Sequence, residues 1–365
     1  MIILPLVFFT SFFVVLLSTP ALIRVALLKR LFDEPDDERK LHRRRIPTIG
    51  GVIIFGGTIF AFALWFPIDT PELVKSVTDF KFIIATIIIL FFVGIKDDII
   101  GTAPVKKLVA HVIVGMILVL MADLRLTGLH GIFGVREIPY WGQIFMSLFT
   151  YIVVVNSFNL IDGVDGLAGG VGLIASVAFG TWFLLAGNTV MACLSFALSG
   201  SLLAFLIFNF SPAKIFMGDS GSLSIGLILC VLSLKLVEYD QSQLTGFVSE
   251  ISKPVFALAV LTYPLFDTLR IFIYRSLRGL SPFSADRNHI HHRLIDIGLN
   301  HRQTVLCIYS YNLIVIALAV FTRHLSPNYS FIIVGIGALA LAQVPFFIPK
   351  RKNISESNSE SANEK

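Results

Sequence analysis

Residues 159–170 read NLIDGVDGLAGG, and apolar runs of membrane length flank this stretch on both sides. Asn159, Asp162 and Asp165 are spaced i, i+3 and i+6, so on a helix all three side chains would lie on one face. Charged side chains beside lipid-facing runs are costly and usually serve a function. We therefore predict a functional site here, in preference to a plain polar turn at the membrane surface.

The composition of the whole chain is typical of a membrane protein. Of its 365 residues, 55% are hydrophobic and 15% are charged, and the mean hydropathy is +0.82. A soluble domain carries roughly 25% charged residues, so a soluble enzyme is excluded and no nucleic acid is expected as a partner. Cys193, Cys230 and Cys307 lie in apolar runs without the spacing of a disulfide framework or a metal site.

Apolar runs near twenty residues long predict membrane-spanning helices. We predict an all-α, polytopic transmembrane helical bundle of about eleven spans. The predicted spans are residues 2–23, 49–67, 80–95, 107–122, 143–158, 168–187, 190–208, 222–237, 254–274, 304–322 and 330–348. Residues 1–349 then form a single transmembrane domain, and residues 350–365, rich in Ser, Asn and Glu, form a disordered cytoplasmic tail.

Lys and Arg residues are concentrated in alternate loops, above all in the loop over residues 24–45. Because basic loops stay in the cytoplasm, this asymmetry predicts an external N-terminus and a cytoplasmic C-terminus. It also predicts that several polar clusters share the cytoplasmic face. These clusters are residues 40–51, 97–107, 159–165, 214–222 and 286–293.

Two of these clusters carry further aspartates. Asp97 and Asp98 are adjacent in GIKDDIIG, so their mutual repulsion calls for a cation nearby; Lys107 follows and is a candidate phosphate contact. Asp219 lies in FMGDSGS, residues 216–222, a glycine-rich turn before an apolar run. Such a turn can bind phosphate through its backbone N–H groups, and its carboxylate suits Mg²⁺. The alternative for Asp219 is an N-cap of the next helix, which is compatible with this role.

Two basic clusters complete the set. RNHIHHRL, residues 287–294, places His289, His291 and His292 beside Arg287. Histidines this close together could bind zinc, but the neighbouring arginines favour an anion such as a diphosphate. KLHRRRIPTIGG, residues 40–51, begins with Lys40 and alone indicates only contact with anionic lipid. Acids for a divalent cation beside bases for phosphate are the layout for phosphoryl transfer.

Taken in order, these motifs resemble a known family. PTIGG, DD, KKL, NLIDGVDGLAGG, MGDSGS and SPFSADRNHIHH are similar to motifs of the polyprenyl-phosphate N-acetylhexosamine-1-phosphate transferases, which include the MraY and WecA types. The resemblance runs from about residue 40 to about residue 300, and the stretch SPFSADRNHIHH is closest to the WecA and TagO branch, which uses UDP-GlcNAc.

The resemblance implies a reaction and roles for its residues. A UDP-N-acetylhexosamine, most simply UDP-GlcNAc, would pass its sugar phosphate to undecaprenyl phosphate with release of UMP, on the cytoplasmic face of a bacterial cytoplasmic (inner) membrane. The catalytic residues would be Asp97, Asp98, Asp162, Asp165 and Asp219. The substrate-binding residues would be Lys40, Lys107, Asn159, Arg287, His289, His291 and His292. Asp219 and Asp98 would hold Mg²⁺, with Mn²⁺ as the alternative ion, and a homodimer is the oligomer that we consider.

Alternatives remain at this point. Within the family, the donor could be UDP-MurNAc-pentapeptide instead. A secondary transporter would place its acids near the midplane on broken helices, and an intramembrane aspartyl protease would need a second aspartate within a span. For the chemistry itself, direct attack by the lipid phosphate is favoured, with Asp97 or Asp98 orienting it or taking a proton, and an aspartyl-phosphate intermediate is the other route.

Overall fold

The computed structural model describes residues 2–29, 31, 46–68, 73–279 and 289–349. Within these residues the chain forms helices and no strands, which confirms the all-α prediction. The N-terminal helices are α1 (Ile3–Leu28), α2 (Gly50–Leu64), α3 (Leu73–Ile100), α4 (Pro104–Met116, continued by the π-helical turn Ile117–Met121), α5 (Tyr140–Leu160) and α6 (Leu167–Leu185). The others are α7 (Thr189–Asn209), α8 (Gly218–Val237), α9 (Phe247–Glu250), α10 (Lys253–Val260), α11 (Thr262–Leu277), α12 (Ile290–Asp296), α13 (His301–Phe321) and α14 (Pro327–Phe347).

The predicted spans coincide with helices of the structure. Among the residues that the structure describes, eight helices are long and apolar enough to cross a membrane, or nine if the bent pair α10–α11 is one span, and α2 is a shorter apolar helix of 15 residues. The chain is thus a polytopic helical membrane protein. The number of about eleven spans, the positions of the termini and the division into one domain and a tail stay predictions.

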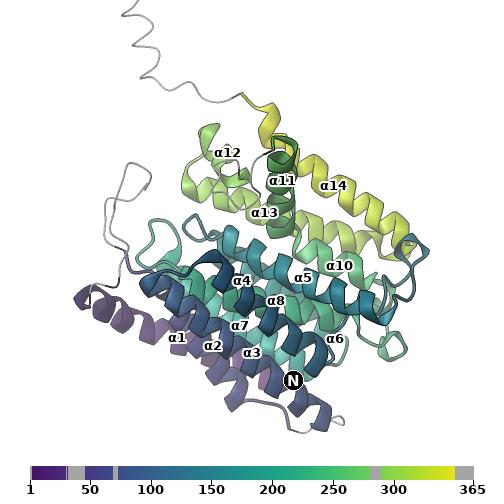
Figure 1. The fold of residues 1–365 in the computed structure, drawn as a ribbon, viewed down its shortest axis with the longest axis horizontal. Helices are drawn as coiled ribbons and strands as arrows, with labels where there is room; N and C mark the ends of the chain where they lie inside the picture. The colour runs from purple at the N-terminus through teal and green to yellow at the C-terminus, as the bar shows by residue number, and fades with distance from the viewer. Residues whose placement is uncertain (1, 30, 32–45, 69–72, 280–288, 350–365) are drawn as a thin grey trace, which may run out of the picture.

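Helix α8 is the centre of the bundle. It packs against α2, α3 and α5, while α1, α6 and α7 form the adjoining layer (Figure 1). Small residues let the neighbours approach closely. A Cβ added to Gly51 of α2 would lie 2.1 Å from the backbone nitrogen of Gly221, and one added to Gly94 of α3 would lie 2.4 Å from Cα of Ser220. These contacts bring the ends of α2 and α3 against the start of α8.

The C-terminal helices α10, α11, α13 and α14 lie along one side of this bundle (Figure 1). Helices α10 and α11 meet at an angle of 76°. Pro264 in the first turn of α11 has no N–H to donate to the carbonyl of Val260, so the helix breaks here. Asn312 of α13 fills the gap: its amide donates to the Val260 carbonyl at 3.3 Å and accepts the N–H of Tyr263 at 3.4 Å.

Candidate active site

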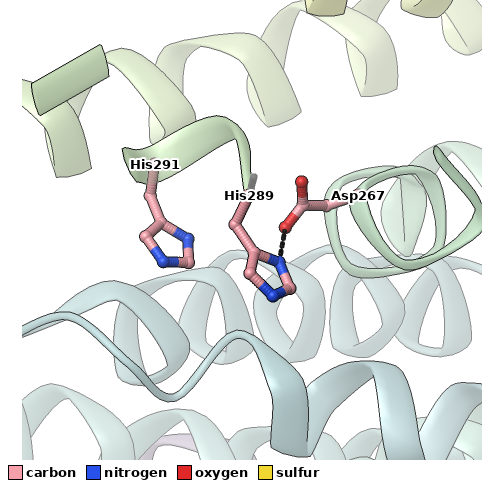
Figure 2. A group of neighbouring side chains, drawn as sticks. All are labelled: Asp267, His289 and His291. Atoms are coloured by element: carbon pink, nitrogen blue, oxygen red, sulfur yellow. Dashed lines mark hydrogen bonds and ion pairs between the residues drawn. The ribbon is translucent and has the colours of Figure 1, made fainter. Parts of the chain in front are cut away.

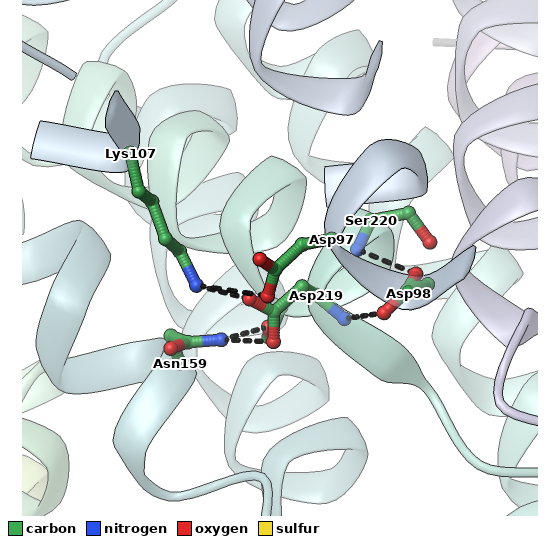
Figure 3. A network of polar contacts seen from close by, with 7 residues as sticks. Asp97, Asp98, Lys107, Asn159, Asp219 and Ser220 are labelled. Carbon is green, nitrogen blue, oxygen red and sulfur yellow. Dashed lines mark hydrogen bonds and ion pairs between the residues drawn. The ribbon is translucent and has the colours of Figure 1, made fainter. Parts of the chain in front are cut away.

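Polar side chains from separate helices meet at the first turn of α8. The Asp219 carboxylate accepts a hydrogen bond from the Asn159 amide at 2.8 Å and contacts the Lys107 ammonium (Figure 3). Lys107 also lies 3.6 Å from a carboxylate oxygen of Asp97. The end of α3, the start of α4, the end of α5 and the start of α8 therefore converge, as the sequence predicts for three of the five polar clusters.

The site is open to a ligand. The side chains of Lys107, Asp97 and Asp219 retain 18%, 23% and 24% of their accessible surface. The ammonium of Lys107 lies between two carboxylates that would otherwise repel each other. A phosphate group that enters the site could take the place of either carboxylate as its partner.

Asp98 has a different environment from its neighbour Asp97. Its two carboxylate oxygens accept the backbone N–H groups of Asp219 at 2.6 Å and of Ser220 at 3.0 Å (Figure 3). Asp98 therefore caps α8 from another helix, and its charge also favours the positive end of the helix dipole. Gly218 permits this approach: its φ of +72° suits glycine, and a Cβ there would lie 2.7 Å from an Asp98 oxygen.

The PTIGG motif joins the same structure through its backbone. The N–H groups of Gly50 and Gly51 donate to the carbonyls of Phe216 and Met217 at 2.9 and 2.8 Å, and the Phe216 N–H donates to Pro47 at 2.8 Å. The glycine-rich turn before α8 is thus held on one side by residues 47–51. Lys40, at the start of this cluster, lies outside the described residues.

The shared helical face of residues 159–165 is not formed. Helix α5 ends at Leu160 and α6 begins at Leu167, and the residues between them form turns. Asn159 faces Asp219, whereas Asp165 is buried and accepts the backbone N–H of Ala213 at 3.0 Å. The i, i+3, i+6 spacing fails here because the chain leaves the helix. Asp165 thus binds a backbone amide and not the Asp219 side chain, and its catalytic role stays a prediction.

Asp162, in contrast, belongs with the carboxylates of the site. Burial raises the pKa of Asp162 well above its ordinary value, and the negative charges of Asp219 and Asp98 act in the same direction. Asp97, Asp98, Asp162 and Asp219 thus form one acidic group. A hard divalent cation fits this donor set, because it prefers carboxylate oxygens and would relieve their repulsion.

The histidine segment, residues 289–292, is bound at its first residue by an aspartate from another helix. His289 Nδ1 lies 2.7 Å from Oδ2 of Asp267 in α11, and the Ile290 N–H donates to Oδ1 at 2.9 Å (Figure 2). Asp267 is fully buried. It is absent from the predicted residues, although an acid inside the apolar run 254–274 is itself a signal of function.

His291 connects this segment to the loop after α5. Its Nε2 lies 3.8 Å from the position that a Cβ on Gly163 would occupy, and its Nδ1 lies 3.4 Å from the Tyr263 hydroxyl. Burial lowers the pKa of His291 to about 3, so this imidazole is neutral at physiological pH. His292 lies beside it, with ring centroids 4.4 Å apart. The predicted partner Arg287 lies outside the described residues.

Comparisons with known proteins identify the family of this chain. The profile of glycosyl transferase family 4 matches residues 80–237, which include Asp97, Lys107, Asn159 and Asp219. The chain is 35% identical over 311 residues to a probable undecaprenyl-phosphate N-acetylglucosaminyl 1-phosphate transferase of Bacillus subtilis, covering 83% of this chain and 80% of the relative.

Two further relatives bear the name undecaprenyl-phosphate alpha-N-acetylglucosaminyl 1-phosphate transferase. That of Yersinia pestis is 31% identical over 78% of this chain and 75% of its own length. That of Escherichia coli K12 is 31% identical over 78% of this chain and 74% of its own length. The match extends well beyond the profile and includes most of each relative, so the chain belongs to glycosyl transferase family 4.

Proposed function

We propose that the chain transfers N-acetylglucosamine-1-phosphate from UDP-GlcNAc to undecaprenyl phosphate, releasing UMP and forming a lipid-linked sugar diphosphate for cell-envelope polysaccharide synthesis. The observation that carries the proposal is the meeting of Asp219, Lys107 and Asn159 at the start of α8. The relatives named for this transfer support the choice of both substrates.

The proposed chemistry is a direct displacement. An oxygen of the lipid phosphate attacks the phosphorus that carries the sugar, the bond from that phosphorus to the bridging oxygen breaks, and UMP leaves with that oxygen. A phosphate monoester has a second pKa near ~6 and is largely dianionic at neutral pH, so it needs little deprotonation. The main obstacle is repulsion between two anionic substrates, which positive charge in the site must offset.

We infer that Asp219 and Asp97 hold Mg²⁺, with Mn²⁺ as the alternative. When bound, the ion would neutralise charge on the phosphate oxygens. The family resemblance implies Asp98 for this role, but both of its oxygens accept α8 amides, so we assign the role to Asp97 instead. Lys107, which lies between Asp97 and Asp219, would bind the diphosphate and stabilise the negative charge that develops on it during the displacement.

The location of the reaction rests on loop charge. The Lys and Arg residues are concentrated in the loops that the sequence pattern assigns to the same face as the site residues, which supports a cytoplasmic active site in a bacterial inner membrane. A water-soluble nucleotide sugar would then reach the site from the cytoplasm, and the lipid phosphate would reach it from the membrane.

Purified full-length protein tests the proposal directly. It would be incubated with Mg²⁺, undecaprenyl phosphate and UDP-GlcNAc, and UMP would be measured. We expect UMP only when both substrates are present. UMP without the lipid would indicate a hydrolase, and no UMP with any donor would reject the transferase. Preference for UDP-MurNAc-pentapeptide would reject the choice of sugar but not the reaction class.

A further inference from the structure

The buried carboxylate of Asp267 has no part in the chemistry described so far. It lies in α11 and has no accessible surface. A buried charge on an apolar helix is costly unless it is paired, and such a residue usually serves a function. Its contacts are therefore informative.

Both oxygens of Asp267 are directed at the histidine segment. Oδ2 is bonded to His289 Nδ1 at 2.7 Å, and Oδ1 accepts the Ile290 N–H at 2.9 Å and lies 3.7 Å from Arg270. A carboxylate surrounded by donors in this way is an acceptor. The proton of this bond therefore resides on His289 Nδ1, and Nε2 is left to face other groups.

The direction of the ring follows from this bond. Figure 2 shows the rings of His289 and His291 on the same side of their backbone, with Asp267 reaching His289 from the neighbouring helix. The two rings are nearly parallel, with centroids 5.2 Å apart, and His291 Nε2 lies against Gly163. Nε2 of His289 is thus turned away from Asp267, on the side of the backbone where the His291 ring also lies.

We propose that Asp267 is a positioning residue that fixes the His289 ring through Nδ1, so that Nε2 meets the diphosphate of the nucleotide sugar. The inference rests on the proposed function, since it takes the donor substrate from it. Carboxylates that hydrogen-bond the second nitrogen of a metal-binding histidine fix its ring orientation, and their loss typically costs about 10- to 100-fold in affinity or activity; we expect the same of a histidine that binds a diphosphate.

A metal ion is the competing occupant of this group. Asp267, His289 and His291 offer ligand atoms within 4.8 Å of one another. The direct Asp267–His289 bond occupies the oxygen and nitrogen that face each other, and the guanidinium of Arg270 beside Oδ1 opposes a cation there. The geometry therefore favours positioning over metal binding.

The experiment compares four full-length proteins: wild type, Asp267→Asn, His289→Ala and the double variant. Rates of UMP release would be measured against UDP-GlcNAc and, separately, against undecaprenyl phosphate. We expect Asp267→Asn to raise KM for UDP-GlcNAc roughly ten- to hundredfold, with KM for the lipid unchanged. We expect the double variant to match His289→Ala, because Asp267 acts through that ring. Asp296→Asn, which removes the same charge from the exposed end of α12, is the control.

A second variant covers the case in which Asp267→Asn does not fold. His289→Asn keeps a group at the Nδ1 position for Asp267 and removes Nε2, so it should retain the wild-type Tm and show the same rise in KM. Multiplied losses in the double variant, wild-type KM values in Asp267→Asn or His289→Asn, or tightly bound zinc lost on Asp267→Asn would each overturn the inference. Absence of UMP release by wild type would instead reject the proposed function.

Discussion

Asp98 accepts the backbone N–H of Asp219 at 2.6 Å, although the two residues are 121 positions apart in the sequence. The adjacent Asp97 faces Lys107 and the side chain of Asp219 instead. The two neighbouring carboxylates thus differ in role: Asp98 caps the N-terminus of α8, and Asp97 faces the open part of the site.

This difference predicts that two neighbouring substitutions impair different properties, one stability and the other turnover. Asp98→Ala removes the cap of α8 and should lower the free energy of unfolding by about 1 kcal/mol, and at most ~2 kcal/mol. Asp97→Ala should leave the Tm in detergent near that of wild type but lower kcat by about a hundredfold or more. Thermal unfolding and UMP release measured on the same preparations check both. Equal losses of Tm in the two variants would contradict the division of roles.

Metal binding can be tested without turnover. If Asp219 and Asp97 hold Mg²⁺ in the folded protein alone, the ion should raise the Tm, and at a hundredfold excess over Kd it should stabilise by about 2.7 kcal/mol. The rise should vanish in Asp219→Asn and Asp97→Asn and persist in Asp296→Asn. Chelation of wild type should abolish UMP release, and added Mg²⁺ should restore it. A Tm that ignores Mg²⁺ would refute this metal site.

The close contact of α2 with α8 gives a matched pair of glycine substitutions. A Cβ on Gly51 would collide with the backbone of Gly221, whereas a Cβ on Gly56 in the same helix meets nothing within 4 Å. Gly51→Ala should therefore destabilise by about 1–3 kcal/mol, and Gly56→Ala should be neutral or stabilise by about 0.5–1 kcal/mol. Tm values and detergent-extracted yields would measure this, and similar behaviour of the two variants would argue against the packing of α8.

The lowered pKa of His291 predicts that the stability of the folded protein depends on pH. Its pKa is lowered to about 3 in the folded protein, whereas an unfolded histidine has a pKa near ~6.5. Below that value the unfolded chain binds the proton and the folded chain does not, so stability falls as the pH decreases. By pH 5 this group should account for a loss of about 2 kcal/mol relative to pH 7. His291→Gln should flatten the change in Tm between pH 7 and 5, and an unchanged slope would contradict the prediction.

The pattern of apolar residues is enough to locate the helices. An apolar run in lipid must satisfy its backbone hydrogen bonds internally, so runs such as 190–208 and 222–237 become α7 and α8 with nearly the predicted ends. The charged residues beside these runs mark the site for a related reason: polar groups at membrane depth are retained where they are useful. Asp97, Lys107, Asn159 and Asp219 are all found from the sequence in this way.

The partners of these residues, in contrast, follow from how the helices pack together. Asp165 turns to Ala213, Asp98 caps α8, and Asp267 supports His289. Spacing along the chain could not reveal these contacts, because a loop between helices has no fixed periodicity and each partner comes from a distant segment. Helix packing around α8 and the break at Pro264 bring those segments together. The role of each carboxylate then depends on which hydrogen-bond donors surround it in space.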